Sequence, residues 1–133
     1  MIGGGSGGLA AAQRAAEHGA RVALVESGRL GGTCVNVGCV PKKITWNAAD
    51  LGGALHEASD YGFQLDVAGH DWTLLKERRD AYILRLNDRY AANLARHKVE
   101  LVRARASFVD ARAVTAAGRR LSAGHIIIAT GGG

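Results

Sequence analysis

The sequence is poor in proline, cysteine and aromatic residues. Pro41 is the one proline in 133 residues, and 47% of the residues are hydrophobic, which differs from the composition of disordered chains. No apolar run approaches the ~20 residues of a membrane span, and no charged segment followed by an apolar one opens the chain as in a secretory leader. The length suits one domain with a hydrophobic core. We therefore expect a globular domain in the cytoplasm.

Basic residues outnumber acidic ones, 17 to 12, but they form no continuous stripe. Many lie beside acids, as in residues 76–80. A nucleic-acid site would need a basic stripe together with exposed aromatic residues. We expect solvated helix faces instead, with no nucleic-acid partner.

The two cysteines of the chain are Cys34 and Cys39. A metal site needs about four ligands, and neither a second cysteine pair nor a histidine cluster stands at suitable spacing, so no metal is expected. A disulfide that closes so small a ring stabilises a fold by only ~2 kcal/mol. In a reducing compartment, a close pair is more often catalytic or redox-sensing than structural. A redox role is favoured, with inert thiols as the alternative.

The spacing of the two cysteines restricts their backbone. Residues five apart on a regular helix have Cα atoms roughly 8.7 Å apart, whereas a disulfide needs about 4.4–6.8 Å. Gly38 allows the backbone to depart from a helix between them, because it has no Cβ. Pro41 favours a helix start. The sequence predicts an irregular turn that carries both cysteines into a helix over residues 42–55.

Residues 3–8 follow the pattern G-x-G-x-x-G. An alanine-rich helix is predicted over residues 9–18, and an apolar strand over residues 21–26 ends in Glu26. Glycines permit a tight turn and a close approach of pyrophosphate, and the helix start supplies N–H groups. Glu26 can accept hydrogen bonds from ribose hydroxyls and would repel a 2′-phosphate, so FAD or NAD is expected rather than NADP. The cysteine pair favours the flavin; the alternative is a flexible glycine-rich tail.

Asp71 is a suitable N-cap for a long helix over residues 72–97. Apolar residues recur on one face of this helix and predict a stripe against the core. The stripe consists of Leu75, Tyr82, Ile83, Leu86, Tyr90, Ala91 and Leu94.

Strands follow the long helix. Residues 99–102 form the first, residues 106–109 and 113–115 alternate like a small antiparallel meander, and residues 125–129 read as a fully buried parallel strand. Thr130 and Gly131 would then lie at its carboxyl end, where such sheets bind ligands. The predicted fold is α/β and Rossmann-like, with a parallel sheet and a small meander, and we expect a fragment cut at both ends.

Three segments resemble the FAD-dependent pyridine nucleotide–disulfide oxidoreductases. They are the glycine loop with Glu26, the run Gly-Gly-Thr-Cys-Val-Asn-Val-Gly-Cys-Val-Pro-Lys-Lys of residues 31–43, and the Ala-Thr-Gly of residues 129–131. The resemblance implies that residues 1–133 are part of an FAD-binding domain, with the NADPH-binding and dimer-interface domains outside the chain. Electrons would pass from NADPH through FAD and the cysteine pair to a disulfide substrate.

The residue sequence of the cysteine run resembles most closely the branch of the family that reduces glutathione disulfide. So do Asp-Tyr-Gly-Phe at residues 60–63 and Arg-Asp-Ala-Tyr at residues 79–82. The alternatives are a related enzyme for another disulfide (dihydrolipoamide, mycothiol, trypanothione or thioredoxin) and an inactive FAD-binding fragment. The resemblance also implies a homodimer, in which a His–Glu base comes from the partner subunit.

The resemblance further implies residue roles. Cys34 would attack glutathione disulfide, Cys39 would take electrons from the flavin, and Lys42 would lie beside the flavin as a third catalytic residue. Gln13 stands where some members of the family have an arginine for a glutathione carboxylate. The positions implied for FAD are Gly3, Gly5, Ser6, Gly7, Gly8, Glu26, Thr33, Cys34, Lys42, Ala106, Thr130 and Gly131, and those implied for the substrate are Ser6, Gln13 and Tyr90.

Overall fold

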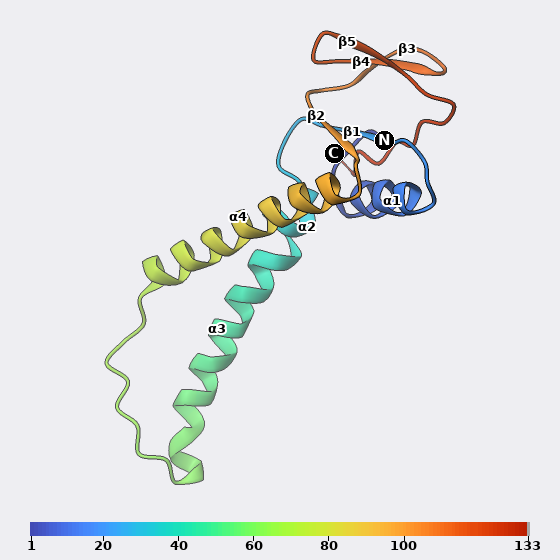
Figure 1. The fold of residues 1–133 in the computed structure, drawn as a ribbon. Helices are drawn as coiled ribbons and strands as arrows, with labels where there is room; N and C mark the ends of the chain where they lie inside the picture. The colour runs from blue at the N-terminus through green and yellow to red at the C-terminus, as the bar shows by residue number, and fades with distance from the viewer. Residues whose placement is uncertain (133) are drawn as a thin grey trace.

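A computed structural model describes residues 1–132 (Figure 1). The helices are α1 (Ser6–Glu17), α2 (Gly32–Asn36), α3 (Cys39–Glu57), the 3-10 helix η1 (Ala58–Tyr61) and α4 (Trp72–Arg96). The strands are β1 (Ala23–Glu26), β2 (Glu100–Arg103), β3 (Ser107–Asp110), β4 (Ala113–Ala116) and β5 (Arg119–Ser122). Across these residues, no helix has the combination of length and hydrophobicity that a membrane crossing demands.

The strands form one parallel and one antiparallel sheet, as predicted. β1 pairs with β2 in parallel, with Leu24 opposite Leu101. Ile2 extends this sheet, because it bridges in parallel to Val25 on one side and to Ile128 on the other. β3, β4 and β5 pair in sequence order as an antiparallel meander. The α/β prediction is therefore confirmed.

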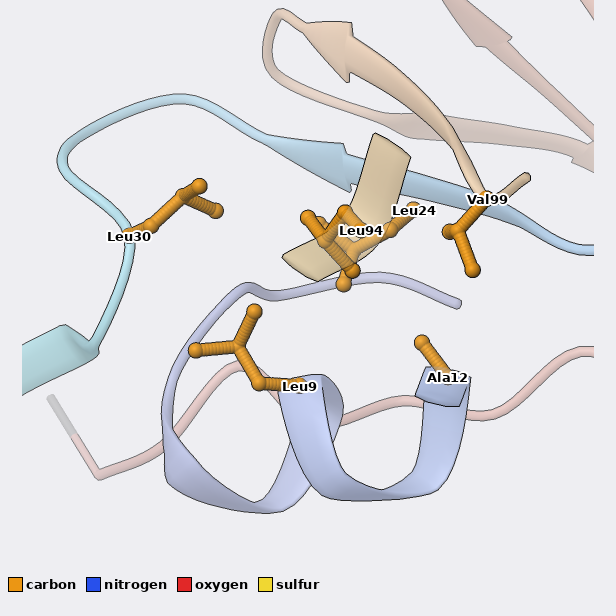
Figure 2. Packing of buried hydrophobic residues seen from close by; sticks show 6 residues of the cluster. All are labelled: Leu9, Ala12, Leu24, Leu30, Leu94 and Val99. Atoms are coloured by element: carbon orange, nitrogen blue, oxygen red, sulfur yellow. The ribbon is translucent and has the colours of Figure 1, made fainter. Parts of the chain in front are cut away.

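The main core lies where α1, β1 and the end of α4 meet (Figure 2). Leu24 of β1 is fully buried, and Leu9 and Ala12 of α1 pack against it together with Leu94 of α4. Alanine at position 12 lets the helix lie close to the strand. A second cluster forms beneath the meander from Val25, Val102 and Ala116. Together these clusters hold the glycine loop, which lies between Ile2 and α1.

Helices α3 and α4 extend away from the sheet and are joined at their far ends by η1 and the segment of residues 62–71 (Figure 1). α3 has no buried residue, whereas α4 buries Ile83 and Leu94. The predicted N-cap of α4 is confirmed, because the Asp71 side chain accepts a hydrogen bond of 2.9 Å from the Leu74 N–H.

Two sequence predictions are wrong. Residues 125–129 do not form a buried strand: Ile127 is 48% and Ile128 62% exposed, and the segment pairs only with Ile2. Its apolar run predicted burial, but within residues 1–132 no second strand or helix covers it. Tyr82 is 40% exposed and leaves the predicted stripe, although the adjacent Ile83 is buried; its ring faces the Arg85 guanidinium instead.

The start of α3 also differs from the prediction. The helix begins at Cys39, and Pro41 is its third residue. Proline is tolerated there because the N–H groups of a first helical turn have no partner within the helix. The cysteine therefore belongs to the helix rather than to the turn before it.

Candidate functional site

Close packing around the glycine loop explains two of its glycines. Gly3 has φ +102°, and a Cβ there would lie 2.2 Å from the Ala129 carbonyl oxygen. A Cβ on Gly8 would lie 1.8 Å from the Gly3 carbonyl oxygen. No side chain fits at either position, so the start of α1 lies directly against the loop. Thr130 follows Ala129 and is thereby brought beside Gly3.

The first turn of α1 is open to a ligand. Its N-cap is Gly5, which supplies no side-chain cap, and no acid occupies the first turn. The N–H groups of Ser6 and Gly7 have no partner within the helix because they precede its first hydrogen bond. Both residues are exposed, and a Cβ on Gly7 would meet nothing within 4 Å. Free N–H groups at the positive end of a helix dipole fit a phosphate group.

Glu26 ends β1 and binds the glycine loop. One carboxylate oxygen accepts a hydrogen bond from the Gly4 N–H, and the other accepts one from the Gly28 N–H, both at 2.6 Å. No motif in the sequence indicated these two bonds. Each carboxylate oxygen has a second lone pair, so hydrogen bonds from ribose hydroxyls remain available.

A second pair of glycines brings the cysteine segment against the glycine loop. Gly31 bridges to Gly5, and its N–H donates to the Gly4 carbonyl oxygen at 2.8 Å. Gly32 has φ +59°, and a Cβ there would lie 2.8 Å from the Gly5 Cα. α2 starts at this contact. Thr33 and the cysteine segment therefore begin beside the proposed phosphate site.

Cys34 and Cys39 lie on different helices. Cys34 is half-buried in α2, and Cys39 is exposed as the first residue of α3. The chain leaves the helical path at Gly38, where a Cβ would lie 2.9 Å from the Thr33 carbonyl oxygen and 3.4 Å from the Cys34 Cα. The predicted departure from a regular helix at Gly38 is thus confirmed, and a close approach of the backbone requires glycine there.

Cys39 alters the acidity of the Cys34 thiol. Both cysteines are free in this structure, so the disulfide between them stays a prediction. The neighbouring Cys39 side chain, followed by burial, raises the pKa of the Cys34 thiol, while the Cys39 backbone opposes this shift. The pair therefore favours a protonated Cys34 unless a base takes its proton.

Lys42 lies one turn beyond Cys39 on α3 and is exposed. It lines an open cavity of about 470 Å³ together with Trp46 and Arg79. Its flexible ammonium group could approach an anionic group that enters this cavity. No three metal-ligating side chains of residues 1–132 converge on a common point.

The other predicted positions lie at several places. Gln13 is half-buried on α1, and Gly131 has φ +80° just beyond the exposed Thr130. Ala106 packs against the second core cluster, and Tyr90 packs against the first. Their roles toward FAD and substrate stay predictions. Asn87 was missed by the sequence reasoning, although it contacts the cysteine segment directly.

Comparison with known proteins identifies similar chains. A family model described as pyridine nucleotide-disulphide oxidoreductase matches residues 1–133. A glutathione reductase of Schizosaccharomyces pombe is 52% identical over 99% of the chain, which spans 30% of that relative. A glutathione reductase of Yarrowia lipolytica is 54% identical over 77% of the chain, corresponding to 23% of its own length. The match confirms the predicted family, and the chain belongs to the pyridine nucleotide-disulphide oxidoreductases.

Proposed function

We propose that this chain is part of an NADPH-dependent glutathione-disulfide reductase, in which it binds FAD and carries a redox-active Cys34–Cys39 pair. The observation that supports this most is the contact of Gly31 and Gly32 with the glycine loop, which brings the thiol pair beside an open helix N-terminus. The two relatives named glutathione reductase, at 52% and 54% identity, favour glutathione disulfide as the substrate. The chain spans less than a third of the length of either relative.

The residues of the glycine loop fit a dinucleotide. Ser6 and Gly7 present N–H groups to its phosphates, and Glu26 accepts from its ribose. The full set proposed for FAD is Gly3, Gly5, Ser6, Gly7, Gly8, Glu26, Thr33, Cys34, Lys42, Ala106, Thr130 and Gly131. When bound, FAD supplies the electron pair from NADPH that opens the Cys34–Cys39 disulfide.

The thiols then reduce the substrate by two exchanges. The Cys34 thiolate attacks one sulfur of glutathione disulfide, forming a mixed disulfide and releasing one glutathione thiolate. Cys39 attacks the Cys34 sulfur, which releases the second glutathione and restores the intramolecular disulfide. Each cycle consumes one NADPH and one proton and yields NADP⁺ and two glutathione thiols.

Cys34 needs a base for its attack, because the neighbouring Cys39 side chain raises the pKa of its thiol. None of the hydrogen bonds found in residues 1–132 joins a histidine to either cysteine. The family resemblance suggests a His–Glu pair from the partner subunit of a homodimer. Lys42 would act beside the flavin, and Ser6, Gln13 and Tyr90 would contact glutathione.

Residues 1–133 would then form part of the FAD-binding domain of a longer cytoplasmic enzyme. The NADPH-binding and dimer-interface domains would lie outside this chain. This assignment is supported by the fraction of each relative that the chain covers, which is 30% and 23%.

The whole protein should be assayed with NADPH and with NADH, using glutathione disulfide, lipoamide and trypanothione disulfide as substrates. We expect the highest kcat/KM for NADPH and glutathione disulfide, and FAD as the flavin released by heat. Cys34→Ser and Cys39→Ser should each abolish turnover while flavin binding persists. Faster turnover on another disulfide would reject glutathione disulfide as the principal substrate, and full activity of either serine variant would reject the thiol mechanism.

A further inference from the structure

Asn87 of α4 bonds to both ends of the short helix that carries Cys34. Its side-chain N–H₂ donates to the Leu30 carbonyl oxygen at 2.8 Å and to the Asn36 side-chain oxygen at 3.1 Å. Leu30 lies just before α2, and Asn36 is its last residue. These contacts join parts of the chain that are 57 and 51 residues apart.

Asn36 completes the network from within α2. Its side-chain N–H₂ donates to the Leu30 carbonyl oxygen at 3.1 Å and to the Gly32 carbonyl oxygen at 2.9 Å. The Leu30 carbonyl therefore accepts from two asparagines, one on each side of the contact between α2 and α4. The Asn36 oxygen faces the Asn87 donor, so each amide is oriented by its bonds.

The Asn87 side chain also has a destabilising feature. Its carbonyl oxygen is buried and, among the atoms of residues 1–132, has no hydrogen-bond partner. A buried acceptor without a donor opposes folding. An apolar side chain of similar size would avoid that loss, so packing alone does not account for an amide at this position. The two donated bonds do account for it.

α2 has only five residues and cannot fix its own orientation, because a helix of one turn is unstable alone. Neither the N-cap residue of α2, Gly31, nor its C-cap residue, Val37, supplies a side-chain cap. The position of Cys34 relative to Cys39 on α3 thus depends on contacts that α2 makes with its surroundings. The asparagine network contacts both of its ends.

We propose that Asn87 is a positioning residue, which acts through Asn36 and the Leu30 carbonyl to hold Cys34 within reach of Cys39. This role rests on the proposed function, in which the two thiols close and open a disulfide. Without the network, the reduced pair gains freedom, whereas the covalent bond holds the oxidised pair as before. Ring closure then loses part of its advantage over reaction with free thiols.

The test measures one equilibrium in the whole protein: dithiol plus glutathione disulfide gives intramolecular disulfide plus two glutathione thiols. Asn87→Leu removes both donors and the unpartnered oxygen while it keeps the number and branching of the side-chain heavy atoms, and Asn87→Asp replaces the donors with acceptors. Asn93→Leu is the matched control, since Asn93 lies on the same helix and its side chain bonds to Arg96 instead. Thiols are quantified after trapping at several ratios of the two glutathione forms.

We expect the equilibrium constant to fall about tenfold in Asn87→Leu, as for loss of two neutral hydrogen bonds, and at least as much in Asn87→Asp. Asn93→Leu should stay within about twofold of the wild type, the scale of a surface change. An unchanged constant in a folded Asn87→Leu protein would overturn the proposal, as would an equal fall in the control.

The outcomes also separate this proposal from the one on which it rests. A wild-type protein that forms no Cys34–Cys39 disulfide at any ratio would refute the redox function itself. A wild type that forms it, with Asn87 variants that match it, would refute only the positioning role. Loss of the fold in both Asn87 variants, seen by circular dichroism, would assign Asn87 to general stability and equally overturn its positioning role.

Discussion

Replacing Gly8 by alanine should disrupt the glycine loop. The new Cβ would lie 1.8 Å from the Gly3 carbonyl oxygen and 2.9 Å from its carbon, both backbone atoms. The loop and the helix must separate by about 1.2 Å to restore a distance of 3.0 Å, below which Cβ contacts essentially do not occur. Gly3 cannot move freely, because its N–H donates to the Val25 carbonyl oxygen at 2.9 Å.

The expected loss combines two terms. Overpacking of this kind costs about 1–3 kcal/mol, and weakening the bond between Gly3 and Val25 adds about 0.5–1.5 kcal/mol. Alanine regains up to about 1 kcal/mol through its higher helix propensity. We expect a net destabilisation of roughly 1–3 kcal/mol, measured by urea unfolding of the purified protein without added dinucleotide.

Gly7→Ala is the matched control, because Gly7 is the preceding residue of the same helix and has open space around its Cα. It should leave the free energy of unfolding unchanged or raise it by up to about 1 kcal/mol. The reasoning would be refuted if Gly8→Ala unfolded at the same urea concentration as Gly7→Ala, since the two differ only in what the added methyl group meets.

Three further perturbations test other parts of the structure. Gly38→Ala should cost about 1–3 kcal/mol through its contact with a backbone oxygen, whereas Gly53→Ala, with open space around it, should not destabilise α3; urea unfolding compares them. Asp71→Ala should lower stability by about 1 kcal/mol in the same assay through loss of the α4 N-cap, and Asp71→Asn should retain most of it. The Arg112 backbone N–H, and then the Arg120 guanidinium, lower the pKa of Asp110, so its folded pKa lies below its unfolded value of about 3.9. The contribution of ionised Asp110 to stability is therefore present above about pH 4 and is lost as the pH falls through the folded pKa. The Tm difference between wild type and Asp110→Asn should accordingly vanish as the pH is lowered. A Tm difference independent of pH would contradict the assignment.

The sequence predicted the parts of the fold that depend on local chemistry. The glycine pattern and the alanine-rich and apolar segments after it predicted α1 and β1 with Glu26 at its end. Asp71 predicted the start of α4. The first two strands of the meander were also predicted, because they pair as sequence neighbours, whereas β5, which pairs with β4, was not. These features need no information from distant segments.

What depends on distant contacts was not predicted. The isoleucines before Thr130 have the composition of a buried strand, yet their burial depends on which segments cover them. The contact of Gly31 with Gly5 and the hydrogen bonds of Asn87 join segments that are 26 or more residues apart. The paired glycines before Thr33 were the one sign of such a close approach, and Asn87 has no motif around it.

The central claim is that Cys34 and Cys39 pass electrons from NADPH to glutathione disulfide. The most direct measurement counts free thiols at these two residues by alkylation and mass spectrometry of the whole protein, before and after one equivalent of NADPH under anaerobic conditions. We predict that both thiols appear together, and that one equivalent of glutathione disulfide then removes both and releases two glutathione molecules. A thiol count unaffected by NADPH, or a reduced pair that persists in excess glutathione disulfide, would contradict the claim.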